Sequence, residues 1–313
     1  MKYIIKFLFL ACLIGNTSIA PHATASDFDM PPQQLGKNVY SLVAPAYGRP
    51  TAENKGWNSN SYFIITSEGV LVIDTGSSET IGRAIIKAIR SITDQPIRWV
   101  INSHSHADHW FGNAVFKDIN AEIISTAKAV ATMKQDGKAD AAAFNRMTKG
   151  TTGTIRFTYP ETLAKHEQIR TFGKTKVKFI FSQDGHSPGD VMVWLPEQRI
   201  IIGGDVLNSE WMPIMTHHGD LKHLVKSLKA VALLNPAIVL PGHGKPTNGN
   251  SVLRDATLLE SVISVVKKGK AHSHTPDQIF QTTLEEIGPI YRTHYNDFDN
   301  NIKYLVTMIT RSI

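Results

Sequence analysis

The segment 104–109 reads His-Ser-His-Ala-Asp-His, so three imidazoles and one carboxylate fall within six residues. These are the side chains that bind zinc and similar metals in proteins. His104 and His106 share one side of an extended segment, whereas Asp108 and His109 need a turn to point to the same place. The pattern therefore predicts a metal site on a loop.

Later strand ends carry three more candidate ligands, each beside glycine: His186, Asp205 and His243. Glycine lets the backbone turn sharply and lets a metal approach the main chain. Together with the first motif they supply five histidines and two aspartates, which is enough for two ions. We assign His104, His106 and His186 to one ion, Asp108, His109 and His243 to the other, and Asp205 to a bridge between them.

A carboxylate bridge between two zinc ions leaves room for a shared water, which the ions acidify to hydroxide near neutral pH. That hydroxide would attack an acyl or phosphoryl group while the ions polarise its oxygen. We expect Asp108 to be catalytic, as the carrier of protons. Asp74 is expected to orient a ligand histidine from behind, or else to cap the next helix. Iron or manganese could replace zinc.

The apolar run 97–102 predicts a buried strand that ends just before the first motif. Similar runs predict strands at 38–43, 62–66, 70–74, 122–124, 177–181, 191–195, 199–203 and 237–240. Helical spacing of apolar residues predicts helices at 81–92, 126–147, 221–231, 251–268 and 276–310. Residues 26–38 are expected to be irregular, and 149–172 to form a loop or an extended edge. Sites in α/β sheets lie at the carboxyl ends of strands, where these ligands fall.

Composition places the chain among ordinary globular proteins, with 42% hydrophobic and 19% charged residues in 313. The net charge of +6 is mildly basic. No cluster of lysine and arginine is interleaved with aromatic residues, so we expect no nucleic-acid partner. The expected partner is a small-molecule substrate, and the sequence leaves the oligomeric state open.

The first 25 residues have the pattern of a signal peptide. Lys2 and Lys6 precede an apolar run at 7–14, and small residues at 23–25 predict cleavage near Ala25. The run is too short to span a bilayer, so stable membrane insertion is not expected. Cys12 is the only cysteine, and lipid attachment there stays open. We expect export, to a bacterial periplasm, of one domain over 26–313 with C-terminal helices from about 250.

The ligand motifs resemble those of the metallo-β-lactamase superfamily in type and in order: 104–109, 185–190, 204–205 and 242–244, preceded by the strand 70–76. The resemblance covers about residues 35–250. It implies an α/β fold, the αββα sandwich, in which two mixed sheets lie face to face with helices outside and metals at one edge. The ligand set resembles that of glyoxalase II, in which aspartate is the bridge.

Two departures from the family bear on the substrate. Asp205 stands where the β-lactamases with a cysteine ligand have that cysteine, and Asn208 stands where they often have a lysine. The C-terminal helices carry basic residues but no glutathione-binding motif that we can match. The resemblance therefore implies the metal site more firmly than the substrate.

We expect a dinuclear zinc hydrolase that cleaves a small ester, thioester, lactone or β-lactam. The alternatives are an iron-dependent oxidoreductase of the persulfide dioxygenase type and a non-catalytic periplasmic metal-binding protein. Specificity is expected to lie in loops 44–61, 149–172 and 206–219. His217 and His218 in the last loop could face the site or the solvent. Four large aromatic residues could line a pocket mouth or belong to the core: Trp57, Trp110, Phe111 and Trp211.

Overall fold

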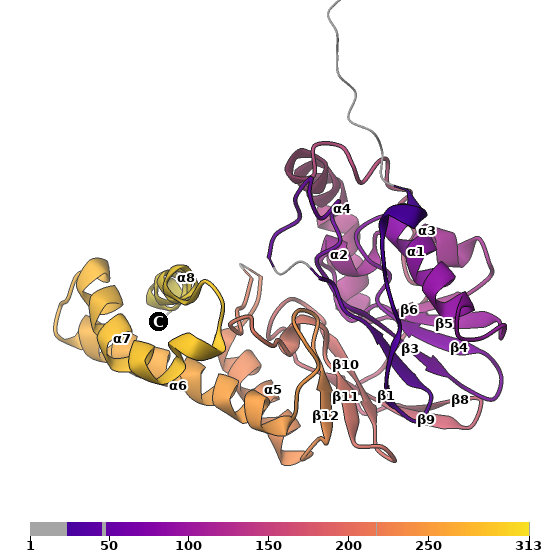
Figure 1. Cartoon of the computed structure of the whole chain (residues 1–313). Helices are drawn as coiled ribbons and strands as arrows, with labels where there is room; N and C mark the ends of the chain where they lie inside the picture. The colour runs from indigo at the N-terminus through magenta and orange to yellow at the C-terminus, as the bar shows by residue number, and fades with distance from the viewer. Residues whose placement is uncertain (1–23, 46–47, 217, 313) are drawn as a thin grey trace, which may run out of the picture.

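The computed structural model describes residues 24–45, 48–216 and 218–312, and it contains two β-sheets that lie face to face (Figure 1). Helices cover the outer side of each sheet, with α1–α4 beside one and α5 and α6 beside the other, while α7 and α8 pack on α6. Residues 1–23 of the proposed leader 1–25, which include Cys12, lie outside the described residues, as does His217. Among the described residues, no helix combines the length and apolar character needed to cross a membrane.

The first sheet has the strand order β1 to β7 and is mixed. Its strands β1 to β4 are antiparallel neighbours, whereas β4 to β7 run parallel. Parallel strands bring their carboxyl ends to one edge, so the segments that follow β4 and β5 meet there. The strands are β1 Gln33–Gly36, β2 Val39–Leu42, β3 Ser61–Ile65, β4 Val70–Ile73, β5 Ile97–Ile101, β6 Glu122–Ser125 and β7 Thr162–Leu163.

The second sheet has the order β12-β11-β10-β9-β8, with β11 and β12 parallel and the other neighbours antiparallel. Its strands are β8 Ile169–Phe172, β9 Thr175–Phe181, β10 Val191–Leu195, β11 Ile200–Ile202 and β12 Ile238–Leu240. The helices are α1 Glu79–Arg90, α2 Ala107–Trp110, α3 Asn113–Lys117, α4 Ala127–Met147, α5 Leu221–Leu233, α6 Gly249–Ala271, α7 Pro276–Tyr291 and α8 Phe298–Ser312. Short 3-10 helices cover Ala25–Asp27, Gly204–Val206 and Arg292–His294.

The strand β4 shows how the layers hold together, because all four of its residues are buried. Successive side chains of a strand point to opposite faces. Leu71 and Ile73 belong to the core between the two sheets, whereas Val70 and Val72 pack with α1 on the outer face. A strand covered on both faces fixes the order helix, sheet, sheet, helix. The predicted αββα sandwich is thus confirmed.

Two predictions about elements were wrong. Residues 26–38, expected to be irregular, include β1, which pairs with β2 through backbone contacts that its largely exposed polar residues do not reveal. The stretch 276–310, expected to be one helix, is two helices. The chain turns between them at Asp297, whose φ of 48° is incompatible with a continuing helix. The alternative of an extended edge within 149–172 is confirmed by β7 and β8.

Asp255 on α6 ties this helix to the segment between α7 and α8, and it makes stability depend on pH. Its buried carboxylate accepts hydrogen bonds from the Tyr295 hydroxyl and from Arg254. Burial raises the pKa of Asp255 to about 7. The folded protein therefore holds this proton more tightly than the unfolded chain does, and the associated stability, present at low pH, is lost as the pH rises through about 7.

We expect the Asp255→Asn variant to lose this dependence. Urea unfolding should show that the wild-type free energy of unfolding falls by about 4 kcal/mol more than that of the variant between about pH 4 and 8, because a pKa raised by about three units corresponds to that difference. Subtracting the variant's profile removes the contributions of all other titrating groups. Parallel profiles would show that Asp255 titrates alike in the folded and unfolded states.

Candidate metal centre

Four chain segments bring the seven predicted side chains to one edge of the sandwich. The first four lie in the segment that follows β5 and in α2, and the others follow β9, β11 and β12. The structure gathers them into two adjoining buried or half-buried clusters, in each of which the candidate ligand atoms lie within 4.8 Å of one another. The first contains His104, His106, His186 and Asp205, and the second contains Asp108, His109 and His243.

Asp205 lies between the two clusters. Its Oδ2 atom is 3.5 Å from His186 Nε2 in the first cluster and 3.2 Å from His243 Nε2 in the second. Its Oδ1 atom is 3.2 Å from His109 Nε2. One carboxylate thus faces histidines of both groups, which is the position that the sequence predicted for the bridge.

Hydrogen bonds on the outer ring nitrogens set the tautomers of four histidines. His109 Nδ1 lies 2.8 Å from Asp74 Oδ2, and the Nδ1 atoms of His186 and His243 lie 2.8 Å from the carbonyl oxygens of Ile214 and Asn58. His104 Nδ1 lies 2.9 Å from Ser103 Oγ, whose own proton goes to Asp74. Because these oxygens accept, each Nδ1 donates its proton outward, and Nε2 is the ring nitrogen that points toward the cluster.

The inward ring nitrogens lie close to one another. His106 Nδ1 lies 3.0 Å from the Nε2 atoms of both His104 and His186. His109 Nε2 and Asp205 Oδ1 are buried and have no hydrogen-bond partner among the described residues. Buried polar atoms are rarely left without a hydrogen-bond partner, and two hydrogen-bond acceptors that face each other repel. Cations held among them would satisfy both requirements, so the residues present fit a metal centre.

The electrostatics of the site also suit a cation. Burial alone would lower the pKa of His109 and of His243, but the Asp205 and Asp108 carboxylates outweigh it and raise both pKa values, so these rings take up positive charge there. Burial lowers the pKa of His106 to about 3 and holds the pKa of His104 well below its ordinary value. Burial alone would raise the pKa of Asp205, but the imidazoles of His243 and His109 outweigh it and hold that pKa well below its ordinary value. Two neutral imidazoles and an ionised carboxylate at neutral pH are the forms that ligate metals.

Asp74 supports the cluster from behind, as predicted. Its Oδ1 atom accepts the Ser103 backbone N–H at 2.7 Å, and its Oδ2 atom faces His109 Nδ1 and the Ser103 hydroxyl. One buried carboxylate thereby orients His109 directly and His104 through Ser103. The alternative of helix capping is wrong, because Ser78 caps α1 by accepting the Ile81 N–H.

Asn58 is a functional candidate that the sequence did not single out. Its side-chain amide donates to Asp108 Oδ2 at 2.9 Å, while its backbone carbonyl receives His243 Nδ1. Asp108 Oδ2 in turn lies 3.5 Å from His243 Nε2. One residue of the loop 44–61 therefore positions two members of the second cluster. The available signal was the Gly-, Pro- and Asn-rich composition of that loop, which pointed to function without naming a residue.

Asp190 plays a similar part for His186. Its Oδ2 atom accepts the His186 backbone N–H at 2.9 Å and the Ser182 hydroxyl at 2.6 Å, while its Oδ1 atom accepts the Ser187 hydroxyl at 2.5 Å. The turn that follows β9 is thus fastened to a buried carboxylate. This explains why His186 is followed so closely by Asp190 in the motif.

Gly242 is required by the close approach of two strand ends. A Cβ at this position would lie 2.0 Å from Asp205 Oδ1 and 2.7 Å from the Gly204 carbonyl carbon. We expect Gly242→Ala to displace the Asp205 carboxylate and to lower kcat/KM about 100-fold, the cost of a displacement of about 1 Å in an active site. Gly288→Ala is the matched control, since its Cβ would meet nothing closer than 3.4 Å. Equal activity in the two variants would contradict the expectation.

The remaining candidates separate into core and surface. Trp57, Trp110 and Phe111 are buried in the core, whereas Trp211 is half-buried and stacks on the His243 ring. His218 is exposed, with its Nε2 atom 3.5 Å from Asp136 Oδ2 of α4, and it belongs to neither cluster.

Comparison with known families gives the class of protein. A family model described as the metallo-beta-lactamase superfamily matches residues 54–243, more than half of the chain. The chain therefore belongs to this superfamily, and with its two buried His/Asp clusters it is a metal-dependent hydrolase. The resemblance inferred from the motifs is confirmed.

Individual relatives are distant. The chain is 24% identical over 238 residues to a metallo-beta-lactamase type 2 of Bacillus sp. strain 170, covering 72% of this chain and 81% of the relative. A metallo-beta-lactamase structure from Pontibacter korlensis is similar with a TM-score of 0.61 and 17% identity, covering 74% and 99% of the two chains. An inverting sec-alkylsulfatase from Pseudomonas sp. is similar with a TM-score of 0.67 and 12% identity, covering 90% and 50%. These structures share the fold.

Proposed function

We propose that this chain is a dinuclear zinc hydrolase. One ion would be held by His104, His106 and His186, the other by Asp108, His109 and His243, with Asp205 bridging the two. The observation that carries the proposal is the convergence of seven ligand-type side chains whose ligand atoms face one another. When bound, such ions lower the pKa of water and polarise the substrate carbonyl.

The chain's own residues would place and move protons around that chemistry. The Asp108 carboxylate lies at the edge of the second cluster and is held by the Asn58 amide, so it is fixed where it can take a proton and return it. Asp74 keeps His109 and His104 with their Nε2 atoms inward. The Trp211 ring covers one face of His243 and limits access of water to it.

For the substrate we propose a small ester, thioester, lactone or β-lactam. The relatives include β-lactamases, which act on a substrate already in this list, and an alkylsulfatase, which adds an alkyl sulfate to the test. Asp205 stands where some β-lactamases have a cysteine ligand. This favours the substrates whose hydrolysis does not require a cysteine ligand. Metal-loaded protein should be assayed with a chromogenic cephalosporin, an acyl thioester, a lactone, a carboxylic ester and an alkyl sulfate.

We expect one of these substrates to be hydrolysed, activity to vanish with a strong chelator, and zinc to restore it. If the zinc-bound protein hydrolysed none of these substrates, the proposed activity would be refuted. Iron in place of zinc, together with oxygen consumption on a persulfide, would support the oxidoreductase alternative instead. Metal binding without turnover in either assay would support a non-catalytic metal-binding protein.

We also propose export to a periplasm, supported by the charged and apolar pattern of the first 25 residues. The test is to express the full chain in a bacterium and to measure the mass of the protein in the periplasmic fraction. A product that begins after Ala25 is expected. An uncleaved product confined to the cytoplasm would refute export.

A further inference from the structure

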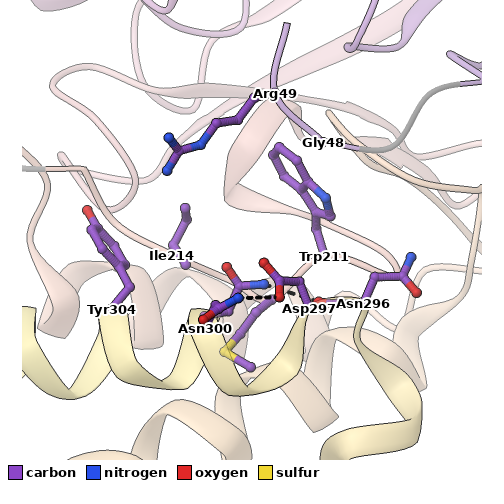
Figure 2. A pocket seen from close by; sticks show the side chains of 10 residues that line it. Gly48, Arg49, Trp211, Ile214, Asn296, Asp297, Asn300 and Tyr304 are labelled. Atoms are coloured by element: carbon purple, nitrogen blue, oxygen red, sulfur yellow. Dashed lines mark hydrogen bonds between the residues drawn. The ribbon is translucent and has the colours of Figure 1, made fainter. Parts of the chain in front are cut away.

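A cavity of about 600 Å³ opens beside the proposed metal centre (Figure 2). Three distant parts of the chain line it: Gly48 and Arg49 of the loop 44–61, the segment that follows the Asp205 turn, and the first half of α8. Trp211 belongs to this wall and also stacks on His243, with ring centroids 4.2 Å apart and the planes at 25°. One indole ring therefore separates the cavity from a proposed metal ligand.

Part of the wall is apolar and flat. Trp211 and Tyr304 stand on either side of the space in Figure 2, and Ile214 lies between them. The Tyr304 hydroxyl donates to the Met215 carbonyl at 3.2 Å, which fixes its ring beside the cavity. Aromatic and aliphatic walls of this kind take a flat apolar body by removing its surface from water.

The opposite wall carries a cation. Arg49 extends over the cavity across from the side chains of α8, and its side chain is exposed. Among the described residues, no carboxylate forms an ion pair with its guanidinium. Asp297 also lines the cavity, but it lies on the α8 side and its Oδ1 atom accepts the Asn300 amide at 2.7 Å. The guanidinium of Arg49 is thus the cationic group that the wall opposite α8 offers to a ligand.

We propose that this cavity determines the substrate, and that it takes a flat apolar group ending in an oxyanion, with the oxyanion bound by Arg49. This rests on the proposed hydrolase function, because the cavity then holds the part of the substrate next to the bond that is cleaved. Guanidinium binds carboxylate and sulfonate alike through paired N–H groups. The α8 helix contributes Tyr304 and Asn300, so the C-terminal helices form part of the binding site.

The test is a binding measurement that does not depend on turnover. Metal-loaded protein is titrated by calorimetry with naphthalene-2-carboxylate, naphthalene-2-sulfonate and the neutral naphthalene-2-carboxamide. The two anions share the proposed chemistry, and their relative affinity distinguishes carboxylate from sulfonate recognition. We expect the better anion to bind at least about tenfold more tightly than the carboxamide.

Variants then assign the effect to Arg49. Arg49→Gln should remove the preference for the anion over the carboxamide, and Arg49→Lys should recover part of it. Arg311→Gln is the matched control, because it removes the same charge from the far end of α8 and should leave the preference unchanged. The control also excludes a general effect of net charge.

Equal binding of anion and carboxamide to the wild type, or an undiminished preference in Arg49→Gln, would overturn the proposal. The proposed hydrolase function fails separately, through the absence of turnover on the substrate panel. Anion binding that depends on Arg49 in a protein without hydrolytic activity would therefore support the binding cavity and refute only the reaction.

Discussion

Replacing Asp205 with asparagine is expected to lower kcat/KM by at least about 10³-fold, which corresponds to about 4 kcal/mol of transition-state stabilisation. The carboxylate lies between the clusters, with one oxygen facing His186 and His243 and the other facing His109. Asparagine has nearly the same size but no charge, and its amide nitrogen carries protons where a ligand needs a lone pair. Both proposed ions would lose their shared ligand.

The measurement is metal content by mass spectrometry together with hydrolysis of whichever substrate the panel identifies. Asp205→Asn should hold fewer than two ions under conditions in which the wild type holds two. Asp299→Asn, the same chemical change on the exposed face of α8, should match the wild type in both measurements. If Asp205→Asn kept two ions and wild-type turnover, the bridging role would be wrong.

Replacing Asp108 with asparagine is expected to lower kcat by about 10²- to 10⁴-fold, the usual contribution of a positioned acid or base. Asp108 is held by Asn58 at one oxygen and lies beside His109 and His243. The amide cannot carry a proton back and forth, so we expect the main loss in kcat and a smaller change in KM.

A comparison with Asn58→Ala separates proton transfer from positioning. That variant keeps the Asp108 carboxylate but frees it, so it should lose only about 10- to 100-fold, as is usual when a supporting contact of a metal site is removed. The pH dependence of kcat should survive in Asn58→Ala and change in Asp108→Asn. Turnover of Asp108→Asn within a few-fold of wild type would remove Asp108 from the reaction.

The metal site could be predicted from the sequence because its residues are chemically conspicuous. Histidines and aspartates at strand ends, separated by glycines, have few other uses in such an arrangement, and the structure brings all seven together. Asp74 was also predictable, because it ends a buried strand next to the motif. The assignment of the ligands to two ions, with Asp205 as the bridge, stays a prediction, and the structure places the Asp205 carboxylate within 3.5 Å of histidines from both clusters.

The supporting contacts could not be predicted in the same way. Asn58 acts through a backbone carbonyl as well as an amide, and it lies 50 residues from Asp108 and 185 from His243 in the chain. Arg49 and α8 meet across an even longer separation, and no periodicity links them. The turn at Asp297 interrupted a continuous apolar stripe. In each case a contact between distant parts of the chain, rather than a local sequence pattern, determines where the residue lies and what it binds.

The most direct test is a titration of metal-free protein with zinc, followed by calorimetry and by activity. Two ions per chain are expected, with His106→Ala and His243→Ala each losing one, since these residues belong to different clusters. Saturation at two equivalents in the wild type and at one in each variant would support a pair of ions gripped by these seven side chains. Saturation below two in the wild type, or unchanged binding in both variants, would contradict it.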